Sequence, residues 1–317
     1  MDHGRDPFHS RTVLQKAFLV IPALSLRTRA EVLLFSVTFV WGSTFVITKS
    51  LLQEVSPFLY SAIRFSFASL IFGAFTFSRI RTMTRRALWQ GMVLGLLLFV
   101  GFSLQTIGLQ LTSASKSAFF TGMLVVFTPI CQTVIERRAP KKGNIAGVVL
   151  VTLGLFLLTS PEGSSFNRGD ALTLICGLLF ALYIVYLDIF AKESDSEHLT
   201  VIQFFSSAIL AGGACLLAED VVWKPSPGLI GGLTYLTVFA TVIALYVQTR
   251  FQKDTTPTRS AIIFSSEPVI AAGFAYVILG EVLGWAGVSG ACVIVVGLLV
   301  SELSDQLFVD TANTISR

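Results

Sequence analysis

Two charged side chains fall inside long apolar stretches of the sequence, where they are positioned for chemistry with a charged solute. Glu267 lies about ten residues into the apolar stretch 258–280 and is followed by Pro268. A carboxyl group deep in hydrocarbon is costly unless it faces water, a ligand or a polar partner, and a proline frees a backbone carbonyl one helical turn earlier. We therefore expect Glu267 to bind a substrate ammonium group or to carry a coupling proton. The alternative is a structural carboxyl group that accepts a hydrogen bond from a backbone amide or a hydroxyl.

Arg64 is the second of these charges and lies some seven residues into the apolar stretch 58–78. Its guanidinium group is a candidate to meet a substrate carboxylate. An arginine at this depth more often snorkels to the membrane interface or pairs within the protein, and that alternative stays open.

A stripe of polar residues marks the apolar stretch 113–135. Ser117, Thr121, Thr128 and Gln132 are spaced by 4, 7 and 4 residues and therefore share one face of a helix. In lipid such a face should contact a cavity or another helix. We take Ser117 and Thr121 as candidates to line a cavity. The alternative is hydrogen bonding between helices, worth about 0.6 kcal/mol each on average.

Aromatic and amide side chains inside the apolar stretches complete the set of candidate binding residues. An aromatic ring can stack on a solute, and a buried amide needs hydrogen-bond partners. Because the chain contains 27 Phe, ordinary packing is the alternative for each ring. The candidates are Trp41, Phe120, Tyr183, Tyr186, Tyr246, Gln105 and Gln248.

The sequence patterns that other chemistries require are missing. The four cysteines form no C-x-x-C pair, and the three histidines lie outside the apolar stretches. The sequence also contains no metal-binding cluster, catalytic triad, phosphate-binding loop or nucleic-acid motif. We therefore expect no enzyme activity, no metal, no cofactor and no nucleic-acid partner.

The elements that hold the candidate residues must be membrane helices. The 317 residues have a mean hydropathy of +0.75 and are only 13% charged, whereas a soluble domain is roughly 25% charged. In lipid the backbone must satisfy its own hydrogen bonds, which leaves helices or closed barrels. Barrel strands need about ten residues of alternating polarity, and the apolar stretches here are longer and do not alternate. The sequence therefore predicts an all-α membrane protein.

Ten apolar stretches are separated by charged or turn-forming residues, which predicts ten transmembrane helices. Residues 1–30 are expected to form an N-terminal arm and residues 304–317 a C-terminal tail. The expected helices are 31–52, 58–78, 88–110, 113–135, 143–159, 169–190, 199–218, 228–249, 258–280 and 284–303.

Lysine and arginine are distributed unevenly between the loops that these helices define. Eighteen lie on the side that carries both termini and four on the other, with Arg64 inside a helix. Cytoplasmic loops of membrane proteins carry the excess of positive charge. We therefore expect a multi-pass protein of the cell (inner) membrane, surrounded by membrane lipids, with the arm, the tail and both termini in the cytoplasm.

The chain also contains an internal repeat. Gln105–Ala118 (QTIGLQLTSASKSA) aligns without a gap on Gln248–Ala261 (QTRFQKDTTPTRSA), and we call this spacing the main offset. We infer two halves of five helices, residues 31–159 and 169–303, joined by a linker at 160–168. Because five is odd, the second half must enter the membrane inverted relative to the first. Many secondary transporters have such inverted repeats, and their substrate site lies at the repeat interface.

Two charged positions show where the halves agree and where they differ. At the main offset Lys116 falls on Arg259, so that a cation is kept. Earlier helices align more weakly at a slightly shorter spacing, which we call the second offset. It places Arg64 on Gln203, so that this charge is not duplicated.

Four short motifs are similar to those of a known family. They are Trp41-Gly42-Ser43, Gly108–Gly122 (GLQLTSASKSAFFTG), Ala181–Tyr186 (ALYIVY) and Ala261–Glu281 (AIIFSSEPVIAAGFAYVILGE). From about residue 31 to residue 303 the chain resembles the EamA-type ten-helix transporters of the drug/metabolite transporter superfamily. One departure is that Arg138 occupies the first-half position that matches Glu281. The resemblance implies a central cavity lined by helices of both halves, and efflux or uptake of amino acids or similar metabolites.

We interpret the chain as a secondary transporter that works by alternating access on a small metabolite. The expected substrate is an amino acid or related solute, and export is the expected direction. The sequence contains no ATP-binding motif, so the energy would come from a gradient, with the proton as candidate coupling ion. A membrane-embedded enzyme and a channel or receptor are the alternatives, and the internal symmetry favours a transporter over both.

Overall fold

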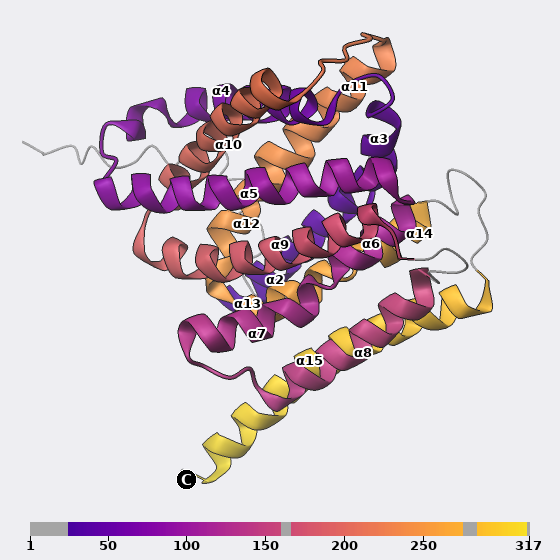
Figure 1. Cartoon of the computed structure of the whole chain (residues 1–317). Coiled ribbons are helices and arrows are strands. Elements are labelled where there is room, and N and C mark those ends of the chain that lie inside the picture. Colours follow the sequence, from indigo (N-terminus) through magenta and orange to yellow (C-terminus); the bar gives the residue numbers. More distant parts are fainter. Residues whose placement is uncertain (1–24, 160–165, 275–283, 316–317) are drawn as a thin grey trace, which may run out of the picture.

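The computed structural model of the chain describes residues 25–159, 166–274 and 284–315. These residues form a bundle of helices (Figure 1), with an isolated antiparallel bridge between Val55 and Trp223. The all-helical class predicted from the sequence is therefore confirmed for the part of the chain that the structure describes.

The first half of the chain contributes seven helical elements. Polar residues cap several of them, as at α5, where the Thr84 hydroxyl accepts a hydrogen bond from the Ala87 N–H. The elements are α2 (Leu26–Gly42), α3 (Thr44–Leu51), α4 (Pro57–Ile80), α5 (Arg85–Leu111), α6 (Ala114–Gly122), α7 (Leu124–Glu136) and α8 (Lys142–Thr159).

The second half begins with a capping box, in which Asn167 and Asp170 each accept a hydrogen bond from the other's backbone N–H. Proline occupies the first position of α11 and of α13, where its missing N–H costs no helical hydrogen bond. The elements are α9 (Arg168–Glu193), α10 (Ser196–Ala218), α11 (Pro227–Tyr235), the π-helix η2 (Leu236–Ile243), α12 (Ala244–Phe251), the 3₁₀ turn η3 (Gln252–Asp254), α13 (Pro257–Phe264), α14 (Glu267–Phe274) and α15 (Trp285–Ile315).

Seven helical stretches within the described residues are long and apolar enough to cross a membrane. They are Leu26–Leu51, Pro57–Arg79, Arg85–Leu111, Lys116–Glu136, Arg168–Glu193, Ser196–Ala218 and Pro227–Asp254. Shorter apolar helices occur at Lys142–Leu158 and Trp285–Ser301. The predicted span 258–280 corresponds to α13 and α14 and continues into residues 275–283, which lie outside the described residues. The count of ten spans therefore stays a prediction.

Two helices extend furthest beyond the bounds expected from the sequence. α2 begins at Leu26, five residues before the predicted start. The Ser25 hydroxyl caps it by accepting a hydrogen bond from the Thr28 N–H, and Arg27 pairs with Glu31 one turn later. α15 continues to Ile315, beyond the predicted end at residue 303. Residues 1–24 of the predicted N-terminal arm lie outside the described residues.

Three stretches that the sequence predicted as continuous helices are interrupted near their middle. α2 gives way to α3 at Ser43, α6 to α7 at Met123, and α13 to α14 at Ser265 and Ser266. At two of these points a serine hydroxyl donates to a backbone carbonyl three or four residues earlier. Such hydrogen bonds compete with the regular helical pattern and bend helices.

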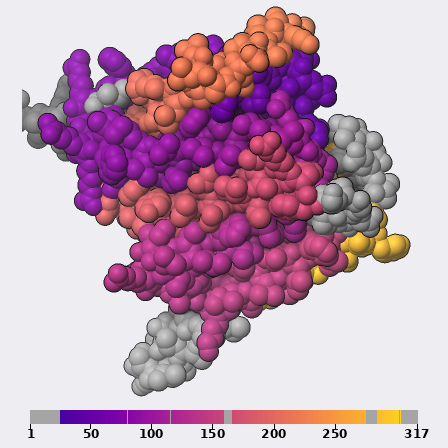
Figure 2. Space-filling view, in the orientation of Figure 1, coloured from indigo at the N-terminus to yellow at the C-terminus, as the bar shows by residue number. Residues whose placement is uncertain are grey.

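Helices that are distant in sequence lie side by side across the bundle. α5 packs between α9 and α10, α10 also packs on α4, and α9 also packs on α7. Figure 2 shows this order on one face, where side chains of the two halves form alternating bands. α8 and α15 run alongside each other at the edge of the bundle (Figure 1). They approach closely at Gly154, where an added Cβ would lie 2.8 Å from the Gly290 carbonyl oxygen.

Candidate functional site

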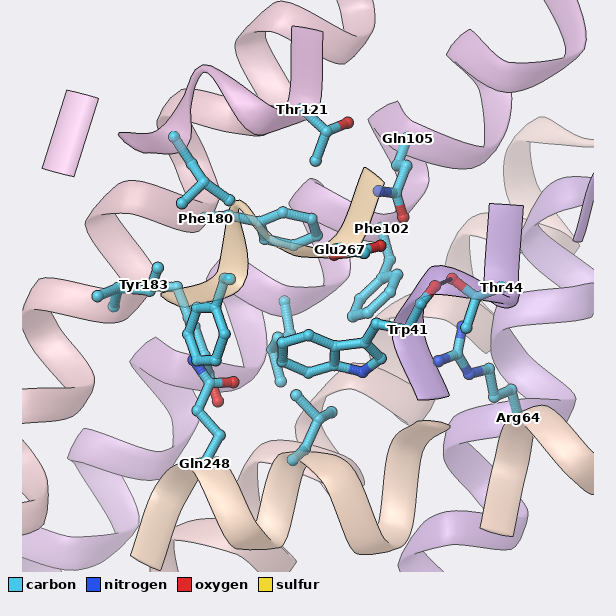
Figure 3. Close-up of a pocket in the computed structure, with 15 residues that line it drawn as sticks. Trp41, Thr44, Arg64, Phe102, Gln105, Thr121, Phe180, Tyr183, Gln248 and Glu267 are labelled. Atoms are coloured by element: carbon cyan, nitrogen blue, oxygen red, sulfur yellow. Dashed lines mark hydrogen bonds between the residues drawn. The ribbon is translucent and has the colours of Figure 1, made fainter. Parts of the chain in front are cut away.

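A cavity lies between the interrupted helices (Figure 3). Its walls come from both halves of the chain. The lining residues are Trp41, Thr44, Arg64, Leu98, Phe102, Gln105, Thr121, Leu124, Phe180, Tyr183, Ile184, Leu245, Gln248, Phe264 and Glu267.

All three helix interruptions border this cavity. Trp41 and Thr44 flank the interruption at Ser43, and Thr121 and Leu124 flank the one at Met123. In the same way, Phe264 and Glu267 lie on either side of the two serines that end α13. Interrupted membrane helices are tolerated where their backbone lines a cavity or is buried in protein. The position of the three interruptions beside the cavity is therefore the one that a membrane helix allows.

Most of the lining residues form pairs at the two offsets found in the sequence repeat. Four pairs fit the main offset, and two further pairs fit the second offset. At the main offset the pairs are Phe102 with Leu245, Gln105 with Gln248, Thr121 with Phe264 and Leu124 with Glu267; at the second offset they are Trp41 with Phe180 and Thr44 with Tyr183.

Glu267 is the acidic residue of the cavity wall and the first residue of α14. Among the described residues its carboxyl group has no hydrogen-bond or ion-pair partner. The free N–H groups and the dipole at a helix start favour a negative charge nearby. Pro268 follows at the second position of α14, where it cannot donate to the Phe264 carbonyl. The carboxyl group is therefore available to a solute inside the cavity.

Arg64 supplies the positive charge of the wall, and it is only 3% exposed. Its Nε donates a hydrogen bond to the Thr241 hydroxyl, and one terminal nitrogen donates to the Tyr60 hydroxyl at 3.0 Å. The guanidinium carbon lies 4.9 Å from the centroid of the Phe102 ring, a cation–π distance. In the described part of the chain no carboxylate pairs with this arginine. The side chain is held within the protein and does not snorkel to its surface.

Trp41 is fixed in the wall by its partners. The indole Nε1 donates to the Ala240 carbonyl at 3.1 Å, and the ring packs edge-on against Phe264 with centroids 5.2 Å apart. Ala240 lies in the π-helix η2, whose widened turn also presents Thr241 to Arg64. Figure 3 shows the rings of the wall gathered around the cavity, with Glu267 among them and Arg64 at one edge beside Thr44.

Hydrogen bonds behind the wall hold the side chains of Tyr183 and Gln248. The Tyr183 hydroxyl donates to Gln203 Oε1 at 3.0 Å. Gln248 Nε2 donates to Gln252 Oε1, and Gln252 in turn donates to the Ile184 carbonyl. These contacts use the amide nitrogen of Gln248 and leave its oxygen for the cavity. Together the walls offer a carboxylate, a guanidinium group, amides and flat aromatic surfaces.

Seven of the residues predicted from the sequence come together in this cavity, and four lie elsewhere. Phe120 packs on Phe166 with ring centroids 5.6 Å apart, Tyr186 packs on Phe190 and Tyr246 packs on Phe72. Ser117 is fully buried in α6. The seven in the wall are Glu267, Gln105, Gln248, Trp41, Thr121, Tyr183 and Arg64.

The predicted polar stripe is divided by the interruption at Met123. Thr121 faces the cavity, whereas the Thr128 hydroxyl donates to the carbonyl four residues earlier. Gln132 accepts a hydrogen bond from Thr258 at 2.7 Å and so links α7 to α13. The alternative of hydrogen bonding between helices therefore describes Gln132.

Sequence reasoning missed the apolar half of the wall. Phe102, Phe180 and Phe264 were not distinguished from the other phenylalanines of the chain. The repeat contains the signal that would have found most of them, because Phe264 is the partner of Thr121 and Phe180 the partner of Trp41. Among the described residues, no group of His, Cys, Asp and Glu side chains is arranged to hold a metal ion.

Comparison with known proteins relates both halves of the chain to one family. Residues 28–160 and residues 167–303 each match the EamA-like transporter family. An uncharacterized transporter of Archaeoglobus fulgidus is 30% identical over 277 residues, which are 87% of each chain. An S-adenosylmethionine/S-adenosylhomocysteine transporter of Chlamydia muridarum is 25% identical over 280 residues, or 81% of this chain and 86% of the relative. A protein of known crystal structure shares the fold, with a TM-score of 0.75, 19% sequence identity, and coverage of 89% of this chain and 99% of the other.

Proposed function

Because the chain belongs to the EamA-like transporter family, we propose that it is a secondary transporter that exports a small metabolite across the cell membrane by alternating access. The substrate is an amino acid or a related solute. The observation that carries this proposal is the cavity, whose walls are built from repeat-related residues of both halves. Transporters with internal repeats bind their substrate at such an interface.

The proposed architecture is ten membrane helices arranged as two inverted halves of five. The two family matches support it, because each covers one half of the chain. Helix starts support it as well, since the starts of α6 and α13, and those of α8 and α15, are both related by the main offset. The excess of Lys and Arg on the side of the termini supports cytoplasmic termini.

The chemistry of the cavity supports a substrate that carries both charges. Glu267 can accept hydrogen bonds from an ammonium group, and the guanidinium group of Arg64 can donate to a carboxylate. The two charged residues have neutral partners in the repeat, Leu124 and Gln203. The wall therefore has one acidic and one basic position, which suits a zwitterionic amino acid in a single orientation.

The aromatic rings of the wall extend the proposal to amino acids that carry a flat or cationic group. One relative is named as a transporter of S-adenosylmethionine and S-adenosylhomocysteine. Both compounds have an amino acid head and an adenine ring, and the first also has a sulfonium cation. Trp41, Phe102 and Phe180 can stack on such a ring or face such a cation.

Uptake by proteoliposomes that contain the purified protein tests the proposal. A thermal-shift screen of amino acids, S-adenosylmethionine, nucleosides and cationic drugs first identifies a ligand. We expect that ligand to be an amino acid and its labelled form to enter the vesicles with saturable kinetics. Arg64→Gln should weaken binding of the substrate, whereas Arg81→Gln, at an exposed position outside the cavity, should not. Absence of any saturable flux from folded, reconstituted protein would contradict a carrier of these solutes.

A further inference from the structure

A buried polar network joins the start of α6 to the start of α9, and we call it the α6 network. Lys116 Nζ lies 3.1 Å from Asp170 Oδ2, and the side chains are 9% and 0% exposed. The Thr112 hydroxyl donates to the other oxygen of the same carboxylate. The Ser113 hydroxyl caps α6 by accepting a hydrogen bond from the Lys116 N–H.

A second buried network, the α13 network, joins the start of α13 to the start of α2. Arg259 Nε lies 2.7 Å from Glu31 Oε1 and a terminal nitrogen lies 2.9 Å from Oε2, so that the pairing is bidentate. The Thr255 hydroxyl donates to Glu31 Oε1 at 2.8 Å. The Thr256 hydroxyl caps α13 by accepting a hydrogen bond from the Arg259 N–H.

Four residues of each network correspond across the repeat, whereas Arg27, which also pairs with Glu31, belongs to the α13 network alone. Each has a threonine that binds the carboxylate, a hydroxyl cap, a cation three residues after the cap, and an acidic residue from the first turns of a distant helix. The corresponding residues are Thr112 with Thr255, Ser113 with Thr256 and Lys116 with Arg259, all at the main offset, and Glu31 with Asp170, at the second offset. These are the offsets that also relate the cavity walls.

The two networks lie at opposite ends of the bundle. Asp170 is in the first turn of α9, whereas Lys253, six residues before Arg259, donates to the Ala191 carbonyl near the end of α9. The 26 residues of α9 extend for about 39 Å at 1.5 Å per residue. Figure 1 agrees, since α6 begins at the right end of the bundle and α13 at the left.

Each network is connected to the cavity by a short half-helix. α6 has nine residues and α13 has eight. Thr121 and Phe264, which line the cavity, each follow the network cation by five residues, and a helix interruption comes within two residues of both. Each half-helix is therefore held by an ion pair at its outer end and is released from the rest of its span at its inner end.

We propose that the two networks are matched latches of the two entrances to the cavity. The α6 network closes one entrance and the α13 network closes the other, and a transport cycle breaks one while the other stays formed. This inference rests on the proposed function, because only alternating access requires two entrances that are never open together. Both latches are closed in this structure.

Buried ion pairs suit this role. Their Coulomb attraction is largely offset by the cost of removing two charges from water, so they add little net stability, but losing one partner is strongly unfavourable. Such a pair holds one geometry firmly when formed. When the half-helix moves, water that enters through the opened entrance can solvate both charges, and the latch can then open without stranding a charge in hydrocarbon.

A cysteine placed at the cavity wall tests the latches without any substrate. Thr44→Cys is introduced into protein whose native cysteines at 131, 176, 215 and 292 are replaced by alanine. A membrane-impermeant maleimide is applied to one side or the other of oriented vesicles. Asp170→Asn should raise the ratio of labelling at the α6 side to labelling at the α13 side at least about tenfold. Glu31→Gln should lower the ratio to a similar extent.

Two milder substitutions keep the test possible if Asp170→Asn or Glu31→Gln does not fold because the buried cation has lost its carboxylate. Thr112→Val removes one hydrogen bond from the α6 latch and Thr255→Val one from the α13 latch, and each leaves the ion pair in place. We expect shifts of at least about threefold in opposite directions. Thr76→Val is the matched control, because this buried threonine bonds within α4 and belongs to neither network.

Folded variants that leave the labelling ratio unchanged, or that move it in the same direction at both ends, would overturn the latches. This failure is distinct from failure of the proposed function. Labelling needs no transport, so a shifted ratio in protein that moves none of the tested solutes supports the latches and contradicts only the proposed substrate class. Measured transport with an unchanged labelling ratio supports the carrier and overturns the latches.

Discussion

Close packing of α8 on α15 makes a sharp prediction about one glycine. A Cβ on Gly154 would lie 2.8 Å from the Gly290 carbonyl oxygen, 2.8 Å from the Ile294 backbone nitrogen and 2.7 Å from Ile294 Cγ1. Two of these contacts are backbone atoms, so no side-chain rotation relieves them and the two helices must separate. Gly154→Ala should therefore be destabilising, although alanine is the better helix former.

The magnitude follows from two opposing terms. Overpacking of a close-packed interface costs about 1–3 kcal/mol, and contacts with rigid backbone place this site at about 2–3 kcal/mol. Replacement of glycine by alanine inside a helix returns about 1 kcal/mol. We expect Gly154→Ala to lower the free energy of unfolding by about 1–2 kcal/mol.

Gly212 in α10 is the matched control, because nothing lies within 4 Å of an added Cβ there. Gly212→Ala should gain the higher helix propensity of alanine without any steric cost. Its free energy of unfolding should therefore rise by up to about 1 kcal/mol. Unfolding in mixed micelles, followed by helical circular dichroism, compares the two variants. If Gly154→Ala is as stable as Gly212→Ala, the close contact of α8 and α15 is wrong.

Further predictions concern orientation and the cavity wall. In a background without native cysteines, Lys224→Cys should react with an impermeant maleimide from outside intact cells and Arg85→Cys should not; the opposite result would reverse the topology. Arg64→Met should fold normally yet lose at least about tenfold in affinity for a substrate with a carboxylate, while Arg81→Met, measured by the same binding titration, should not; equal affinities would exclude contact with the substrate. Trp41→Phe removes one hydrogen bond and should cost about 0.5–1.5 kcal/mol of stability in chemical unfolding; an unchanged midpoint would show that this bond is not needed to fix the ring.

Most helix starts could be predicted from the sequence because they depend on the residues at the start itself. Pro57, Pro227 and Pro257 each begin a helix within one residue of the predicted start, since proline fits the first turn and cannot continue a preceding helix. The repeat was readable for a similar reason. Its best-matched block covers the α6 and α13 caps, where particular side chains are required and not merely apolar ones.

The helix interruptions and the apolar residues of the cavity wall could not be predicted from the sequence. The residues around Met123 are as apolar as the rest of the span, and hydropathy does not distinguish a continuous helix from two half-helices in lipid. Phenylalanines that face the cavity look the same in sequence as those that face lipid. The widened turns of the π-helix η2 change the direction in which its residues point relative to a regular α-helix. The contact of Thr241 with Arg64 could therefore not be predicted from regular helical periodicity.

Substitution of Glu267 in reconstituted protein tests the central claim most directly, since this carboxyl group lines the cavity without a partner among the described residues. Uptake is compared between the unmodified protein, Glu267→Gln and Asp220→Asn, a control at an exposed position. If Glu267 binds a substrate amine, Glu267→Gln should weaken binding at every pH; if it carries a proton, the dependence of transport on pH should vanish. In both cases Asp220→Asn should behave as the unmodified protein. A folded Glu267→Gln protein with unchanged rate, affinity and pH profile would contradict the assignment of this cavity as the transport site.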